Sequence, residues 1–259
     1  MRVIAIDWSG RRRGEARSIC LAEARATALT RLESGRTREE VRDHLVELAA
    51  SGDEMVVGID CSFSLPVWFL HEREYGSAPE LWDAATRDGE HWLTDCEPPF
   101  WGHRGRPRPD LPAHFRATES GIAAVGGIRP KSTFQIGGAG SVGSGSVRAF
   151  PVLAALRNAG FAIWPFDEPG TRTVVEVWPR ACTGPVVKSS WEARRAYVDS
   201  RHPALPSRLR DAAIASEDAF DAAITALVMA AHVDDLCALT MPRHEAAPLE
   251  GWVWSPPTD

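Results

Sequence analysis

The chain has 259 residues, of which 44% are hydrophobic and 25% charged, and its formal net charge is −6. This composition is typical of a globular protein with enough residues for one large α/β domain. The acidic balance excludes a protein that is basic throughout, so nucleic-acid binding would require a local basic patch. Five cysteines at wide spacings, without a Cys-x-x-Cys pair, predict neither a disulfide framework nor a zinc site.

The expected location is the cytoplasm, with no membrane partner. The first residues, "MRVIAIDW", form a strand-like run and lack the long apolar segment of a signal peptide. The apolar stretches elsewhere are too short to span a bilayer. Unpaired thiols are typical of a reducing compartment.

The first sixty residues predict the order strand, strand, strand, helix, strand. Apolar runs rich in β-branched residues give the strands, and Val41, Leu45 and Leu48 at helical spacing give the helix, which Thr37 is expected to cap. Strands are predicted at 2–8, 17–23, 26–33, 54–62, 161–166 and 173–179, with a terminal strand or aromatic tail at 250–256. Helices are predicted at 37–51, 147–160, 189–201, 206–216 and 217–232, and Pro151 is expected to interrupt or start the second.

The middle of the chain predicts an insertion, at about 63–145, within a single domain of residues 1–259. It contains a helical piece at 78–93, a proline-rich loop at 97–113 and a glycine-serine stretch at 137–146. Loops this long are commonly functional. Its tryptophans are expected mostly to pack in the core, although they would also suit base stacking: Trp68, Trp82, Trp92 and Trp101.

Acidic residues follow two of the predicted strands and open the helix at 217–232. "VIAID" ends on Asp7 and "VVGID" on Asp60, so parallel pairing would bring both carboxylates to one sheet edge. On the helix, Asp218 and Asp221 are three residues apart and share a face. Such carboxylate clusters hold Mg²⁺ or Mn²⁺, and a pair of these ions can activate water for phosphodiester hydrolysis.

Each acid also has an ordinary structural explanation. Aspartates often end strands as turn formers, which would account for Asp7 and Asp60 taken singly. Asp218 follows Ser216, a good N-cap, and an acid in the first turn complements the helix dipole. Asp221 lies deeper in the helix, where aspartate is disfavoured, so the structural explanation fits it least.

These motifs in this order resemble a family of predicted RNase H-like nucleases, with an active site similar to that of Holliday-junction resolvases. The resemblance extends from residue 4 to about 231, through "IAIDWSG", "VVGIDCSFSLP", "RPKSTFQIGGAGSVGSGS", "GFAIWPFD", "VVEVWPRA" and "SEDAFDAAITALVMA". It implies a mixed five-stranded sheet flanked by helices. It also implies metal-ligand roles for the acidic residues Asp7, Asp60, Asp218 and Asp221. Glu176, in "VVEVWP", is a further catalytic candidate, with a solvent-facing strand glutamate as the alternative.

Three basic residues are candidate substrate ligands. Arg129 and Lys131 precede the glycine-serine stretch, whose amides would suit a phosphate, and Lys188 is one of only two lysines. "GAGSVG" at 138–143 matches G-x-G-x-x-G, but its short polar strand and delayed helix disfavour a dinucleotide site. "RRR" at 11–13 would either steer a phosphate backbone or form a solvated turn.

The expected function is divalent-metal-dependent hydrolysis of phosphodiester bonds in nucleic acid. One alternative is a non-catalytic binding protein that keeps the fold and its acidic pocket. Another is a small-molecule phosphotransferase, because "DWSG" also resembles the first phosphate loop of actin-like ATPases. That alternative requires a second, similar domain, for which the chain is short.

Overall fold

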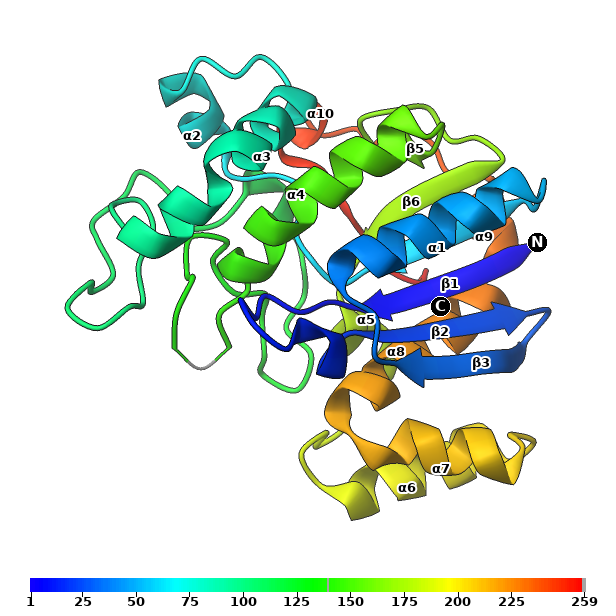
Figure 1. The fold of residues 1–259 in the computed structure, drawn as a ribbon. Helices are drawn as coiled ribbons and strands as arrows, with labels where there is room; N and C mark the ends of the chain where they lie inside the picture. Colours follow the sequence, from blue (N-terminus) through cyan, green and yellow to red (C-terminus); the bar gives the residue numbers. More distant parts are fainter. Residues whose placement is uncertain (139, 258–259) are drawn as a thin grey trace.

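A mixed seven-stranded sheet forms the centre of the computed structural model, which describes residues 1–138 and 140–257 (Figure 1). The strand order is β3-β2-β1-β4-β6-β5, and β7 pairs with β6. The strands are β1 Arg2–Asp7, β2 Cys20–Arg25, β3 Ala28–Ser34, β4 Met55–Ile59, β5 Ala162–Ile163, β6 Arg172–Val177 and β7 Val253–Trp254. The predicted α/β class is therefore confirmed.

The expected count of five strands is wrong, because two short strands extend the sheet beyond β6. β5 pairs with Thr173 and Val174, and β7 pairs further along β6, with Glu176 and Val177. Both pairs are parallel, as are β1 with β4 and β4 with β6, whereas β2 is antiparallel to β1. β4 covers the other edge of β6, so β5 and β7 lie end to end along the remaining one.

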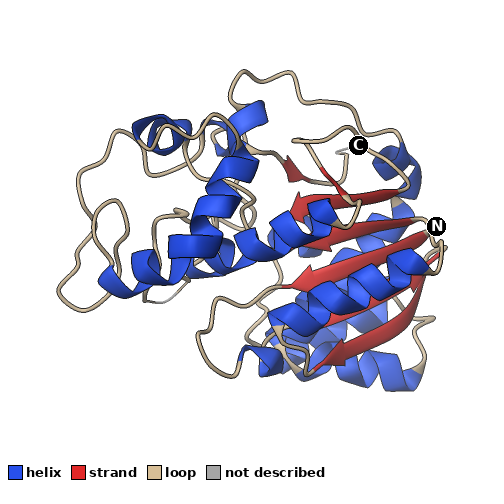
Figure 2. Ribbon diagram, turned by 45° about the horizontal axis from the view of Figure 1, so that its top comes forward, coloured by secondary structure: helices blue, strands red, loops and turns tan. Residues whose placement is uncertain are grey.

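Helices cover both faces of the sheet (Figures 1 and 2). Ile4 and Ile6 of β1 point to the face covered by α1 (Arg38–Ala50) and α4 (Gly143–Asn158). Val3 and Ala5 point to the face covered by α8 (Glu217–Ala231). A sheet buried on both faces needs nearly continuous apolar strands, which explains the runs in the sequence.

Most predicted helices are present, and α4 differs most from the prediction. Thr37 caps α1 in a capping box with Glu40. α4 starts at Gly143 rather than residue 147 and continues through Pro151. Gly143 is required there, because a Cβ would lie 2.1 Å from the carbonyl oxygen of Thr133. The other helices are η1 Glu15–Arg17, α2 Val67–Glu72, α3 Ala78–Asp95, η2 Ala117–Glu119, α5 Pro179–Thr183, α6 Trp191–Arg201, α7 Ser207–Ala215, α9 Val233–Cys237 and α10 Ala247–Glu250.

The insertion is a packed extension of the core. Its aromatic side chains join the cluster that begins on the α1 and α4 face of the sheet. Trp82 is fully buried and donates its indole N–H to the Phe63 carbonyl oxygen at 2.8 Å. Trp68 packs against Phe134 with ring centroids 5.4 Å apart, and donates to the Ala113 carbonyl oxygen at 2.9 Å. These contacts confirm the packing role expected for the tryptophans.

Two simpler expectations are met within the part of the chain that the structure describes. No helix among residues 1–138 and 140–257 is long and apolar enough to cross a bilayer. All five cysteines are free thiols, and only Cys237 is exposed.

Candidate metal centre

Strand register brings Asp7 and Asp60 to the same edge of the sheet. Ile6 pairs with Ile59 in the parallel β1–β4 ladder, and the Asp60 N–H donates to the Ile6 carbonyl oxygen at 3.0 Å. The next residues, Asp7 and Asp60, therefore stand side by side at the carboxyl ends of their strands. Because side chains alternate, both carboxylates lie on the face that α8 covers.

The α8 helix brings the other two aspartates to this edge. Its N-cap is Ser216, whose hydroxyl oxygen accepts the Ala219 N–H at 3.0 Å. The helix packs on β1 and β2, and its first two turns contain Asp218 and Asp221. Asp221 is only 9% exposed, as is Asp7.

The four carboxylates lie close enough to one another for their charges to shift their pKa values. Burial raises the pKa of Asp7 well above its ordinary value, and the charges of Asp60, Asp221 and Asp218 raise it further. Burial, with Asp221 as the next cause, raises the pKa of Asp60 to about 7. Burial is also the main cause of the raised pKa of Asp218 and of Asp221. We call Asp7, Asp60, Asp218 and Asp221 the carboxylate cluster.

Lys188 lies within the cluster and offsets part of its charge. It belongs to the segment between α5 and α6, and its ammonium group forms an ion pair with Asp221 Oδ2. Its charge lowers the pKa of Asp7, Asp60 and Asp221 against the stronger upward effects. Lys188 was expected to bind substrate, and the structure places it among the candidate metal ligands instead.

The donor chemistry of the cluster fits a hard divalent cation. Asp221 Oδ1 is buried without a hydrogen-bond partner among the described residues, so this oxygen is available to a ligand. Within the same residues, no three His, Cys, Asp or Glu side chains stand close enough together to coordinate an ion. Repulsion between like charges keeps carboxylates apart when no cation is bound, and a cation bound between them would remove that repulsion.

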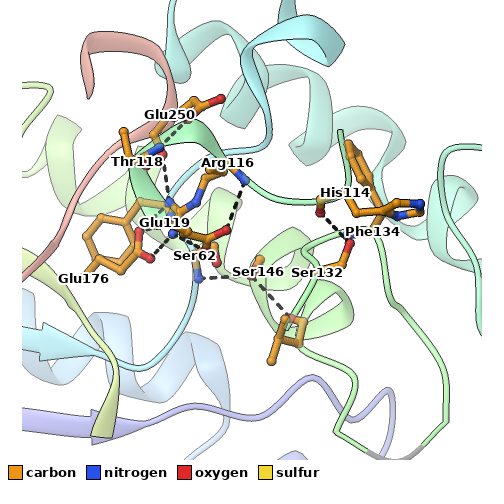
Figure 3. A network of polar contacts seen from close by, with 12 residues as sticks. Ser62, His114, Arg116, Thr118, Glu119, Ser132, Phe134, Ser146, Glu176 and Glu250 are labelled. Atoms are coloured by element: carbon orange, nitrogen blue, oxygen red, sulfur yellow. Dashed lines mark hydrogen bonds and ion pairs between the residues drawn. The ribbon is translucent and has the colours of Figure 1, made fainter. Parts of the chain in front are cut away.

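Glu176 lies apart from the four aspartates, on the opposite face of the sheet. Its carboxylate forms an ion pair with Arg116 and accepts the Phe63 N–H at 2.9 Å (Figure 3). Glu176 is only 3% exposed, so the alternative of a solvent-facing strand glutamate is wrong. Burial raises its pKa, and Arg116 acts against that rise. Its charge still reaches the cluster, where it raises the pKa of Asp60.

A cavity of about 300 Å³, here called the carboxylate cleft, opens beside Asp60. Arg129 and Lys131, the candidate substrate ligands, are exposed and line this cleft. Further lining residues come from the ends of strands, the loop after β4 and the start of α4: Trp8, Ser62, Glu176, Trp178, Ser141 and Val142. The basic side chains thus lie next to one member of the carboxylate cluster.

The glycine-serine stretch serves mainly to let chain segments approach closely. A Cβ on Gly10 would lie 2.5 Å from the Gly145 nitrogen, and Trp8 donates its indole N–H to the Gly145 carbonyl oxygen at 3.1 Å. These contacts hold the loop after β1 against the first turn of α4. Within the G-x-G-x-x-G match at 138–143, Gly143 likewise has a packing explanation, because a Cβ there would lie 2.1 Å from the Thr133 carbonyl oxygen. Ala139 of this match lies outside the described residues.

Sequence reasoning missed two residues near the cluster. Arg116 gave no signal, because nothing separates it in the sequence from the many exposed arginines of the insertion. Trp178 directly follows β6 and lines the cleft. Its position directly after a strand that contains Glu176 was the available signal.

Comparison of the chain with protein-family models, curated proteins and solved structures finds no match in any of the three. The functional assignment therefore depends on the geometry and chemistry of this chain.

Proposed function

We propose that this protein is a divalent-metal-dependent nuclease with an RNase H-like fold. The observation that carries the proposal is the convergence of four aspartates from β1, β4 and α8 at one sheet edge, each with a raised pKa. Strongly perturbed acids in one place are typical of functional sites. Aspartates with a purely structural role would instead accept hydrogen bonds from N–H or O–H groups of the protein.

The fold supports the RNase H-like part of the proposal. Apart from the two-residue strands β5 and β7, the sheet has five strands, with β2 antiparallel to its neighbours. These five longer strands support the mixed sheet that the family resemblance implies, and β5 and β7 extend it to seven. The described residues form one sheet, and the second, similar domain that an actin-like phosphotransferase requires is not among them.

In the proposed reaction, Asp7, Asp60, Asp218 and Asp221 hold Mg²⁺ or Mn²⁺. A bound ion supplies positive charge that stabilises the phosphate and its leaving oxygen as negative charge develops. Arg129 and Lys131 bind phosphate groups of the substrate in the carboxylate cleft. Lys188 limits the repulsion among the carboxylates and lowers the pKa of Asp221 against the larger upward effect of burial.

A cleavage assay tests this function. The protein is incubated with single-stranded and duplex DNA and RNA in Mg²⁺, in Mn²⁺ and in EDTA. We expect cleavage that requires the metal and is lost in Asp7→Asn. Asp211→Asn is the matched control, because it removes an exposed carboxylate on α7, away from the cluster. Equal activity of the two variants, or metal-dependent binding of every substrate without cleavage, would contradict the proposal.

A further inference from the structure

A second cavity adjoins the carboxylate cleft. It has a volume of about 420 Å³ and shares Trp178 and Val253 with the cleft, so the two spaces are neighbours across these side chains. Its walls are mainly apolar or aromatic, and none of the described residues that line it is charged: Thr118, Gly121, Ile122, Ala123, Val125, Trp178, Ala181, Trp252, Val253, Ser255, Pro256 and Pro257. We call it the aromatic cavity.

The walls of the aromatic cavity are tied to β6 and to the hydrogen bonds around Arg116. Val253 pairs with Glu176 in the β6–β7 ladder, which places Trp252 beside the end of β6. On the opposite wall, the Thr118 N–H donates to the Glu250 carboxylate at 3.1 Å. Arg116 donates to the Glu250 carbonyl oxygen at 2.7 Å and so ties the two walls together (Figure 3).

The two tryptophans of the cavity differ from those of the insertion core. Trp178 and Trp252 are only partly buried, whereas Trp82 is fully enclosed. Trp252 packs one side against His244, with ring centroids 5.9 Å apart and planes inclined by 49°. Partly exposed indole rings beside a cavity without charged walls suit a flat, weakly polar ring system.

We propose that the aromatic cavity is a base-binding subsite and that the substrate is single-stranded nucleic acid. This inference rests on the proposed nuclease function. A nucleotide joins an anionic phosphate to a flat base. The carboxylate cleft offers basic side chains for the phosphate, and the aromatic cavity offers indole rings for the base. A base paired within a duplex cannot enter such a cavity, so the base must be unpaired.

Charge complementarity favours a nucleotide over an apolar peptide. A peptide would suit the walls of the aromatic cavity, but an apolar peptide has no phosphate for Arg129 and Lys131 of the adjoining cleft. The cleft also contains Asp60, Glu119 and Glu176, and Arg116 pairs with both glutamates. A nucleotide that spans both spaces satisfies the apolar and the basic surfaces together.

Binding measurements without catalysis test the subsite. Fluorescence anisotropy in EDTA compares a labelled oligothymidylate of about six nucleotides with an abasic strand of equal length. We expect the wild-type protein to bind the oligothymidylate at least about fivefold more tightly. A duplex of the same length should bind more weakly than the single strand. Equal affinity for the normal and abasic strands, or for single strand and duplex, would overturn the proposal.

Variants separate stacking from folding. Trp252→Leu should abolish the preference for the normal strand, and Trp252→Phe, which keeps an aromatic ring, should retain it. Trp191→Leu is the control, because Trp191 is 43% exposed and lies on α6, away from the cavity. A preference that survives in Trp252→Leu, or that is lost equally in Trp191→Leu, would contradict the assignment.

The subsite and the nuclease function can fail separately. Asp7→Asn should lose cleavage and keep the preference for the normal strand. Metal-dependent cleavage by a wild-type protein without base preference would overturn the subsite and leave the nuclease function standing. Base preference without cleavage would support the subsite and contradict the function.

Discussion

Two buried groups of charges lie close to each other in this protein, and their carboxylates are treated differently. Around Arg116, every oxygen of Glu119, Glu176 and Glu250 accepts a hydrogen bond from a side chain or a backbone N–H. In the carboxylate cluster, Lys188 pairs with one oxygen of Asp221, and the other oxygen is buried without a described partner.

This is the difference that we expect between a structural site and the proposed metal centre. The Arg116 network joins β6, η2, α10 and the loop after β4, so its charges hold chain segments in place. The carboxylate cluster joins strands and a helix that apolar packing already holds. Its repulsion opposes folding, and a bound cation is the ligand that would offset it.

The largest expected effect is on cleavage by Asp221→Asn. Asn at this position keeps the shape of the side chain and loses its charge, so metal binding and metal-dependent cleavage should fall more than about 100-fold. Initial rates across a Mn²⁺ titration measure the loss, with Asp211→Asn as the control. Unchanged rates at every Mn²⁺ concentration would remove Asp221 from the metal centre.

Arg116→Met should cause the largest loss of stability. It leaves Glu119 and Glu176 buried without their cation, and breaking such a pair costs about 3–5 kcal/mol of unfolding free energy. Urea unfolding measures the loss. Arg106→Met is the control, since Arg106 is exposed in the same insertion and should change stability by less than about 0.5 kcal/mol. Equal stability of the two variants would contradict a structural role for the network.

Lys188→Met tests the internal cation of the cluster. Without the ammonium group, the buried carboxyl group of Asp221 loses its ion-pair partner, which should cost about 1–3 kcal/mol in metal-free buffer. Mn²⁺ should then raise the melting temperature more than it does in the wild-type protein, because it replaces the missing charge. Lys131→Met, which changes an exposed lysine of the cleft, should show neither effect.

Asp60→Asn should stabilise the metal-free protein in a pH-dependent way. The pKa of Asp60 is raised from 3.8 to about 7 in the folded state, so the folded protein holds this proton more tightly than the unfolded chain. That contribution to stability is complete below about pH 4 and is lost as the pH rises through 7.

The asparagine does not ionise, so the free energy of unfolding of the variant should exceed that of the wild-type protein by up to about 4 kcal/mol at pH 8, with a much smaller difference at pH 4. Urea unfolding at the two pH values provides the measurement. A difference that is independent of pH would show that Asp60 ionises as freely in the folded protein as in the unfolded chain.

The sheet and the position of the aspartates followed from local patterns. Apolar runs that end in an acid located β1 and β4, and the parallel register then placed Asp7 beside Asp60. Ser216 as the N-cap located the start of α8, and hence the turns that contain Asp218 and Asp221. These features depend on periodicity and capping, which are encoded over a few residues.

Features that depend on distant contacts were not predictable from the sequence. The Arg116 and Glu176 ion pair joins residues sixty positions apart, and no local pattern distinguishes either partner. The start of α4 was placed too late, because Gly143 and Gly145 weaken helix propensity but allow the backbone to approach residues 133 and 10. A strand was expected at 161–166 and a strand or aromatic tail at 250–256, but β5 and β7 have only two residues each, because pairing with β6 sets their length.

Anomalous diffraction from a crystal soaked in Mn²⁺ tests the central claim most directly. The account predicts a manganese peak bounded by the carboxylates of Asp7, Asp60 and Asp221, and loss of that peak in Asp7→Asn. A peak elsewhere on the molecule, or none at a concentration that saturates cleavage, would contradict the assignment of the carboxylate cluster as a metal centre.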